Sequence, residues 1–227
     1  MLFNNKTQNT EKPRRSGISE AFDYLEILIF AICVVFLLFT LSIRICRVDG
    51  DSMSTTLENE QLLIVSDLFY APSSGDIIVF HQTNNSVESL NKPLVKRVIA
   101  TAGQYYKIEY APIAGEKGLT YYEMRVYVSA DDRFDASERL DESFINFEDA
   151  YRRVKLYSGI GRYGQGCTLD SDTGIYSTTG QVPEGHIFVM GDNRYYSNDS
   201  RLDVGFVDAE FVLGKLIVRL APFGVVK

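Results

Sequence analysis

The sequence is short of the residue types that build disulfide scaffolds, metal sites and histidine-based active sites. Its 227 residues include three cysteines, two histidines and no tryptophan. An odd number of cysteines without close spacing makes neither a disulfide framework nor a zinc site. The two histidines, His81 and His186, leave little choice of base for a Ser-His-Asp hydrolase, and neither has a distinctive setting. We therefore expect no metal and no other cofactor.

Positive charge is also scarce. Lys and Arg together number 23 against 30 Asp and Glu, which gives a formal net charge of −7 at pH 7. Proteins that bind nucleic acids need an excess of basic side chains to neutralise phosphates, so this balance argues against such a role. Residues 131–150 hold eight acidic and two basic residues. We interpret them as the solvated face of an inserted segment.

One long apolar run stands near the N-terminus. Residues 27–43 contain no charged side chain, and Tyr24 and Leu25 extend the run beyond the single Glu26. A helix of about 20 residues crosses the hydrocarbon core of a bilayer. A cleaved signal peptide would have a shorter apolar region and a small-residue cleavage site after it. We therefore predict an uncleaved transmembrane anchor at residues 24–44, preceded by a loose tail at 1–23.

The basic residues around this run predict its orientation. Four precede it (Lys6, Lys12, Arg14 and Arg15) and two closely follow it (Arg44 and Arg47). Because basic residues are enriched on the cytoplasmic side, this asymmetry favours a cytoplasmic N-terminus and an extracytoplasmic body.

After the anchor, short runs rich in Val, Ile and Leu alternate with turn residues, which is typical of β-strands. Six such runs lie at 61–65, 77–80, 94–100, 125–128, 186–190 and 215–220. Residues 105–180 differ in being rich in Tyr, Gly and acidic side chains, and 138–155 is the best helical candidate there. We predict a mainly β fold, with an antiparallel β core formed by 45–104 and 181–227 and an inserted, variable β/loop region at 105–180.

Ser52 and Lys96 are the candidates for nucleophilic chemistry. Gly50 allows a sharp turn that would present Ser52 at its tip. Strand alternation places Lys96 on the same face as Leu94 and Val98. An ammonium group among apolar side chains is desolvated, which lowers its pKa and allows a lysine to act as a general base. Considered alone, each residue also has an ordinary interpretation. Ser52 would be a turn serine that bonds to the local backbone, and Lys96 a strand lysine whose amine extends to solvent.

A third segment, residues 191–201, directly follows the apolar strand 186–190. Functional loops are often mounted on a rigid strand in this way. Its charged residues, together with Arg97, could form carboxylate–guanidinium pairs that fix the loop; they are Asp192, Arg194, Asp199 and Arg201. Ser197 could hydrogen-bond the neutral amine of Lys96.

Together these segments resemble a known family. The motifs, in chain order, are Ser52-Met53-x-x-Thr56-Leu57, Gly75-Asp76-Ile77, Lys96-Arg97-Val98-Ile99 and Gly191-Asp192-Asn193-Arg194-x-x-Ser197-x-Asp199-Ser200-Arg201. This order, with the N-terminal anchor, is similar to that of the bacterial type I signal peptidases (leader peptidases). The resemblance covers the anchor and residues 45–104 and 181–227.

The resemblance implies a membrane-anchored serine endopeptidase that removes N-terminal signal peptides from exported preproteins through an acyl-enzyme. It assigns Ser52 as the nucleophile and Lys96 as the general base of a Ser/Lys dyad. Ser197 would orient the lysine, and the supporting positions would be Arg97, Asp192, Asp199 and Arg201. It also implies a catalytic β core, preprotein substrates with small residues before the cut, and a bacterial plasma membrane location, single-pass, with contacts to lipid and to the export machinery.

Two positions depart from the family pattern. Thr55 stands where members usually have proline, so the turn after Ser52 is less constrained. Gly50 stands where some members have a serine whose hydroxyl helps to bind the oxyanion. The oxyanion hole would then use the Ser52 backbone N–H.

Two other readings are weighed against this one. Self-cleaving repressors of the DNA-damage response share a Ser/Lys dyad, but they are soluble and bind DNA, which the anchor and the charge of −7 disfavour. A non-catalytic membrane-anchored assembly factor of the same fold would have no reason to retain both Ser52 and Lys96.

Overall fold

The computed structural model describes residues 17–54, 56–82, 90–114, 120–142, 145, 166–221 and 223–226. It divides into two compact units, Met1–Ser42 and Ile43–Lys227, each of which is described by itself. Thr55 and most of the helical candidate 138–155 lie outside the described residues; Glu138 ends a 3₁₀ turn, Ala136–Glu138.

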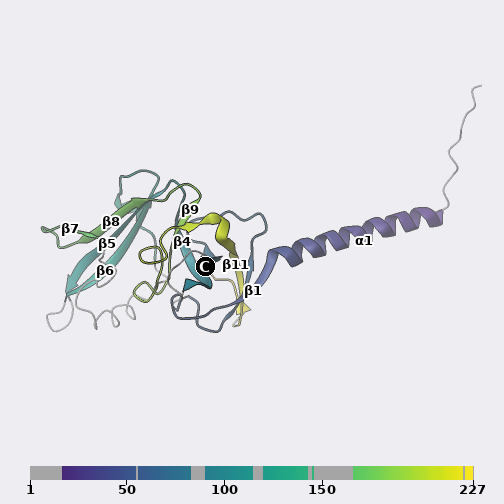
Figure 1. Ribbon diagram of the computed structural model, residues 1–227, viewed down its shortest axis with the longest axis horizontal. Coiled ribbons are helices and arrows are strands. Elements are labelled where there is room, and N and C mark those ends of the chain that lie inside the picture. Colours follow the sequence, from purple (N-terminus) through teal and green to yellow (C-terminus); the bar gives the residue numbers. More distant parts are fainter. Residues whose placement is uncertain are drawn as a thin grey trace, which may run out of the picture. The chain divides into compact units, whose positions relative to one another are not determined.

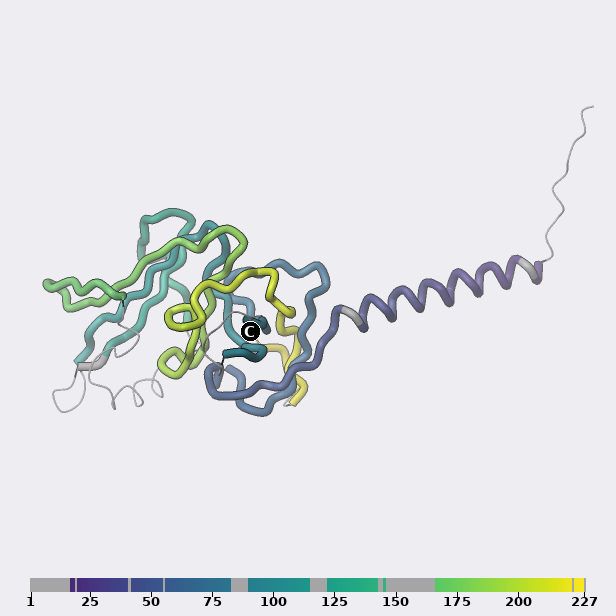
Figure 2. The backbone as a smooth tube through the Cα atoms, viewed as in Figure 1, coloured from purple at the N-terminus to yellow at the C-terminus, as the bar shows by residue number. Residues whose placement is uncertain are grey.

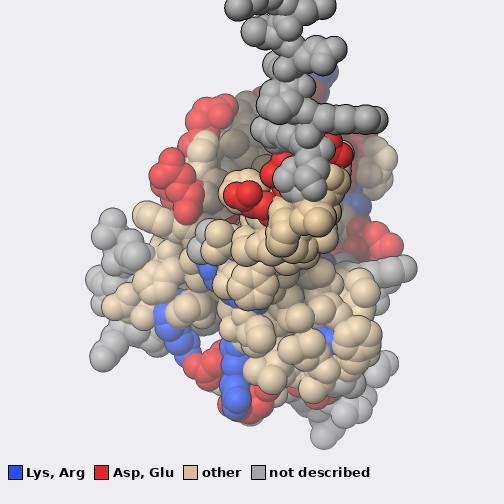
Figure 3. All heavy atoms as spheres, turned by 90° about the vertical axis from the view of Figure 1, so that its right-hand side faces the viewer, with Lys and Arg blue, Asp and Glu red and all other residues tan. Residues whose placement is uncertain are grey.

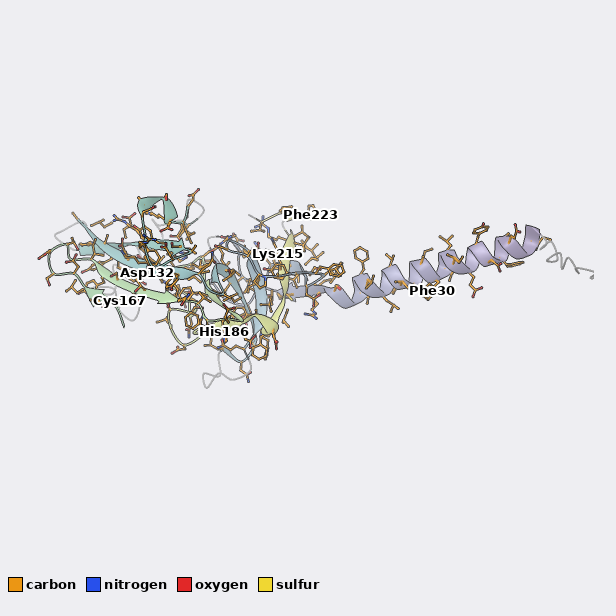
Figure 4. All side chains as sticks on the ribbon, turned by 90° about the horizontal axis from the view of Figure 1, so that it is seen from above. Phe30, Asp132, Cys167, His186, Lys215 and Phe223 are labelled. Carbon is orange, nitrogen blue, oxygen red and sulfur yellow. The ribbon has the colours of Figure 1, made fainter. Side chains whose placement is uncertain are left out.

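The described residues of the first unit form helix α1 (Gly17–Ser42), which includes an apolar span at Glu20–Thr40 with a mean hydropathy of 2.5. Figure 4 shows side chains, Phe30 among them, projecting from both edges of the helix in that view, and the exposed large apolar side chains run from Ile18 to Phe39. A helix that is apolar all round suits a bilayer rather than one side of a soluble core. The helix begins earlier than the predicted Tyr24, because the polar turn that carries Glu20 is also helical, and an acidic side chain is favourable there.

The second unit is made of two antiparallel sheets (Figure 1). The larger has the strand order β1-β2-β11-β3-β4-β9-β10, with β12 paired to β11. Its strands are β1 (Ile43–Arg47), β2 (Leu62–Ser66), β3 (Ile77–His81), β4 (Pro93–Thr101), β9 (His186–Met190), β10 (Val207–Asp208), β11 (Val212–Leu220) and β12 (Phe223–Gly224). The smaller has the order β6-β5-β8-β7, from β5 (Tyr105–Ala114), β6 (Thr120–Ser129), β7 (Thr168–Leu169) and β8 (Tyr176–Gln181).

The prediction of a mainly β, antiparallel fold with one N-terminal apolar helix is therefore confirmed. The six predicted runs fall in β2, β3, β4, β6, β9 and β11. The prediction missed β1, β5 and β8, and also the two-residue strands β7, β10 and β12. Residues 43–44 were assigned to the anchor, but they pair with Ser66 and Val65 at the edge of the larger sheet. β5 and β8 carry too many polar side chains to show as apolar runs, because one face of each is partly exposed.

Three clusters of buried side chains form the core. One lies between the segment 48–57 and strands β2 and β3, and a second packs around β3, β4 and β9. The third joins the two sheets, since it contains Phe188 and Met190 from β9 beside Ile108 from β5 and Val126 from β6. The smaller sheet is thus packed onto the larger one through buried apolar side chains.

The irregular segment 191–206 follows β9. In Figure 2 this yellow-green stretch lies between the two sheets. Its hydrogen bonds run to both sides, because Asn193 bonds to the Ser52 turn and Tyr195 to the Tyr122 carbonyl of β6. This position makes the segment the link through which the two sheets meet at the candidate site.

Candidate active site

Ser52 sits in a tight turn that buried neighbours hold in place. Gly50, at a φ of 101°, opens the turn in a conformation that residues with a Cβ rarely adopt. Met53 and Leu57 are almost fully buried, and the Thr56 and Leu57 N–H groups donate to the Met53 carbonyl. The Ser52 hydroxyl therefore projects from a short turn whose next residue is anchored in the core.

Lys96 lies in the middle of β4, opposite Ile78 of β3. Only 3% of the residue is exposed. Its Nζ donates to Ser52 Oγ at 2.7 Å and to the Val95 carbonyl at 2.9 Å. The two side chains that the sequence singled out, which are 44 residues apart, thus meet at hydrogen-bond distance.

Burial lowers the pKa of Lys96 from 10.5 to about 8, against the negative charges of Asp199 and Asp192, which raise it. Burial dominates because an ammonium group in an apolar surrounding loses its hydration. About one lysine in ten is then neutral at pH 7, compared with roughly one in 3,000 at a pKa of 10.5. Lys96 can therefore accept a proton from Ser52 without a further partner.

A buried ion pair between Arg97 and Asp192 supports the Ser52 turn. Arg97 donates to both carboxylate oxygens of Asp192, at 2.9 and 2.7 Å, and also to the Gly75 carbonyl. The side chains of Arg97 and Asp192 are 5% and 0% exposed. The Thr56 hydroxyl donates to the same carboxylate, which links the pair to the Ser52 turn.

The neighbouring Asn193 binds this turn directly. Its backbone N–H donates to the Ser52 carbonyl at 2.9 Å, and its side-chain amide donates to the Asp51 carbonyl and the Ser54 hydroxyl. The sequence prediction did not assign Asn193 a role, although it stands within the quoted motif. Its contacts are mainly to backbone atoms, which a sequence pattern cannot specify.

A second buried pair joins Asp199 to Arg201, with Nε and Nη2 donating to the two carboxylate oxygens at 2.8 and 2.7 Å. Burial alone would raise the pKa of Asp199, but Arg201, the Gly191 N–H and the Ser197 hydroxyl hold it below its usual value. Ser197 is 1% exposed. The structure therefore brings together Ser52, Lys96 and all five predicted supporting residues, with Ser197 bonded to Asp199.

His186 and the three cysteines lie outside the cluster around Ser52 and Lys96. His186 lies at the start of β9, where its Nδ1 meets the Glu184 carbonyl at 2.8 Å (Figure 4). Cys33, Cys46 and Cys167 are free thiols, so no disulfide joins Cys46 to Cys167. Among the described residues, no group of three or more His, Cys, Asp or Glu side chains is arranged to hold a metal ion.

The family model described as "Signal peptidase, peptidase S26" matches residues 21–221. The chain belongs to this signal peptidase family. A signal peptidase I of Bacillus caldolyticus is 34% identical over 196 residues, which cover 85% of this chain and 87% of that protein.

Other signal peptidases are more distant. A signal peptidase IB of Staphylococcus aureus is 24% identical over 90% of this chain and 91% of its own length. The probable signal peptidase I-1 of Synechocystis sp. is 28% identical over 77% of this chain and 69% of its own length. A crystal structure of a signal peptidase I from Enterococcus faecalis V583 aligns with 65% of this chain and 97% of that one, at 25% identity and a TM-score of 0.36.

The Gly191 position of this signal peptidase gives a first prediction. A Cβ at Gly191 would lie 2.3 Å from Ser197 Oγ and 2.5 Å from the Ser52 carbonyl oxygen, closer than real Cβ contacts. Gly191→Ala should therefore displace the Ser52 turn and lower kcat roughly 100-fold, the cost of misplacing a reacting group by about 1 Å. Gly224→Ala is the matched control, because the nearest atom to its Cβ would be 3.8 Å away. Equal kcat in both variants would contradict the assigned contact.

Proposed function

We propose that this chain removes signal peptides from exported preproteins by a Ser/Lys dyad, with Ser52 as nucleophile and Lys96 as general base. It is a serine peptidase of the signal peptidase I type, and its apolar helix α1 makes it a membrane-anchored protein. The observation that carries the dyad is the 2.7 Å contact between a buried lysine amine and the Ser52 hydroxyl.

The reaction follows from this contact. Neutral Lys96 takes the Ser52 proton as Oγ attacks the carbonyl carbon of the scissile bond, and the resulting ammonium then protonates the leaving amine. The ester to Ser52 is hydrolysed by a water molecule that Lys96 deprotonates in turn. In the part of the chain that the structure describes, no acceptor meets the Ser52 backbone N–H, which leaves it available for the oxyanion.

The other proposed roles concern positioning. Arg97 and Asp192 would hold the Ser52 turn, and Asp199 with Arg201 would hold the segment after β9. Ser197 would orient Lys96, from its buried position beside Gly191. We propose further that 45–104 and 181–227 form the catalytic core and 105–180 an inserted region.

The proposed substrates are preproteins with small residues before the cleaved bond, at the outer face of a bacterial plasma membrane. The basic N-terminal tail would lie in the cytoplasm, α1 would cross once, and the enzyme would meet lipid and the export machinery. A substrate held by its own apolar segment in the same bilayer reaches the enzyme at a high effective concentration.

A fluorogenic peptide with Ala-x-Ala before the cut tests the activity on detergent-solubilised full-length protein. Cleavage by the wild type but not by Ser52→Ala is expected, and equal cleavage by both would refute the proposal.

The low pKa of Lys96 gives a second prediction. Because the base is the neutral amine, turnover should reach a plateau above pH 9 and fall on acidification through a pKa of about 8. Below that value the rate should drop about tenfold per pH unit, in proportion to the neutral fraction. The pH dependence of kcat for the fluorogenic peptide measures this. A rate that stays level from pH 9 to pH 5 would exclude a lysine base.

A further inference from the structure

Glu142 joins the acidic segment 131–150 to residues 191–201, which follow β9 and are called the catalytic loop below. The side chain of Glu142 is only 7% exposed, and it pairs with Nη1 of Arg194, whose side chain is fully buried. Burial raises the pKa of Glu142, and the charge and hydrogen bond of Arg194 oppose this rise. The other described acids of the segment are more exposed: Asp131, Asp132, Asp135 and Asp141 lie at the surface, and Glu138 is partly exposed. Figure 3 shows one face of the molecule, on which acidic side chains occur at several separate places and some adjoin Lys or Arg.

Arg194 connects this carboxylate to the backbone beside the dyad. Its Nε donates to the Gly191 carbonyl at 3.1 Å, and its own carbonyl accepts from Nη2 of Arg201 at 2.7 Å. Gly191 in turn donates to Asp199 and packs against the Ser52 carbonyl. A continuous chain of buried contacts therefore leads from Glu142 to the Ser52 turn.

In the described part of the chain, Glu142 is the only carboxylate that pairs with Arg194, and Nη2 of Arg194 has no hydrogen-bond partner there. A buried guanidinium without its carboxylate is strongly disfavoured, so it moves towards water or draws water in. Movement of the guanidinium removes the Nε donor from the Gly191 carbonyl, and water that enters competes for this hydrogen bond. The segment that binds the Ser52 turn would then lose one of the hydrogen bonds that hold it in place.

We propose that Glu142 is a positioning residue of the active site, which acts through Arg194 to hold Gly191 and the Ser52 turn in place. The inserted segment thus supports, through Arg194, the geometry of the active site. This inference rests on the proposed function, since it takes Ser52 as the reacting group.

The test compares two Glu→Gln variants in the same segment of the full-length protein. Glu142→Gln should lower kcat roughly ten- to hundredfold, measured well below its melting temperature, with KM little changed, because misplacing the nucleophile by about 1 Å costs up to about 100-fold. Glu138→Gln is the control: Glu138 bonds to the Ser129 hydroxyl and the Asp135 N–H. This variant should keep the wild-type kcat, and its only expected change is a lower melting temperature. If Glu142→Gln lowers only the melting temperature and keeps kcat, the inference is overturned.

Amide hydrogen exchange gives a readout that does not depend on activity. Glu142→Gln should accelerate exchange at Gly191 and Asn193, whose N–H groups donate to Asp199 and to the Ser52 carbonyl, while Glu138→Gln leaves it unchanged. Unaltered exchange at both amides would also overturn the inference. Wild-type enzyme that fails to cleave the signal peptide, or Ser52→Ala that cleaves it, would instead count against the proposed function alone.

A double variant covers the case in which Glu142→Gln does not fold. Glu142→Met with Arg194→Met removes both buried charges, and such replacements are often neutral or stabilising. The folded double variant should still show reduced kcat and faster exchange at Gly191, because the Gly191 carbonyl has lost its donor. Wild-type values of both would overturn the inference.

Discussion

Replacement of Lys96 by methionine is expected to abolish cleavage and, at the same time, to make the folded protein more stable. Methionine fills nearly the same space but can neither accept the Ser52 proton nor return it. Loss of the group that activates the nucleophile costs other serine peptidases about 10⁴-fold or more in kcat. Ser52→Ala should abolish turnover to the same extent without the gain in stability.

The gain in stability follows from the cost of burying the ammonium group. The fall in the pKa of Lys96 from 10.5 to about 8 corresponds to about 3 kcal/mol, which disfavours the folded state at pH 8 and below. Since the unfolded chain binds more protons between pH 8 and 10.5, the wild type becomes more stable as the pH rises through this range. The advantage of Lys96→Met should therefore be largest at neutral pH and shrink towards pH 10.5.

Thermal unfolding followed at pH 7 and pH 10 measures this difference. Lys107→Met is the matched control, because Lys107 is partly exposed and pairs with Glu109 on the smaller sheet. It should keep full activity and show no gain in melting temperature. A Lys96→Met protein that melts below the wild type at pH 7 would contradict a dominant desolvation cost, and measurable turnover would contradict the general base.

The second large effect is expected at the buried Arg97–Asp192 pair. Asp192→Ala leaves the Arg97 guanidinium buried without its carboxylate, and breaking such a pair costs about 3–5 kcal/mol. For a protein of this size, that lowers the melting temperature by roughly 10 °C or more. Activity should fall as well, because Asp192 also accepts the Thr56 hydroxyl of the Ser52 turn.

Asp67→Ala provides the comparison, since Asp67 pairs with Arg44 at 3.2 Å in a partly exposed position. Exposed pairs contribute at most about 1 kcal/mol, so the melting temperature should change little. The two Asp→Ala variants thus differ mainly in the burial of the arginine left behind. Similar melting temperatures for both would show that solvent reaches Arg97.

The sequence alone was sufficient for the class of fold and the family. Val- and Ile-rich runs bounded by turn residues indicated the strands, because side-chain alternation and turn formation are local properties. The motifs around Ser52, Lys96 and 191–201 indicated the family. The helix boundaries were less accurate: α1 begins at Gly17 and ends where residue 43 starts to pair with β2, and strand pairing depends on distant residues.

Three features were decided only by the tertiary structure. The pKa of Lys96 depends on which groups surround it, and Asp199 and Asp192 lie about a hundred residues away along the chain. The need for glycine at 191 comes from the close approach of Ser197 and the Ser52 carbonyl. The Glu142–Arg194 pair joins an acidic stretch, which its composition marks as solvated surface, to the catalytic loop. Composition and spacing describe neighbours in sequence, whereas burial and charge pairing depend on neighbours in space.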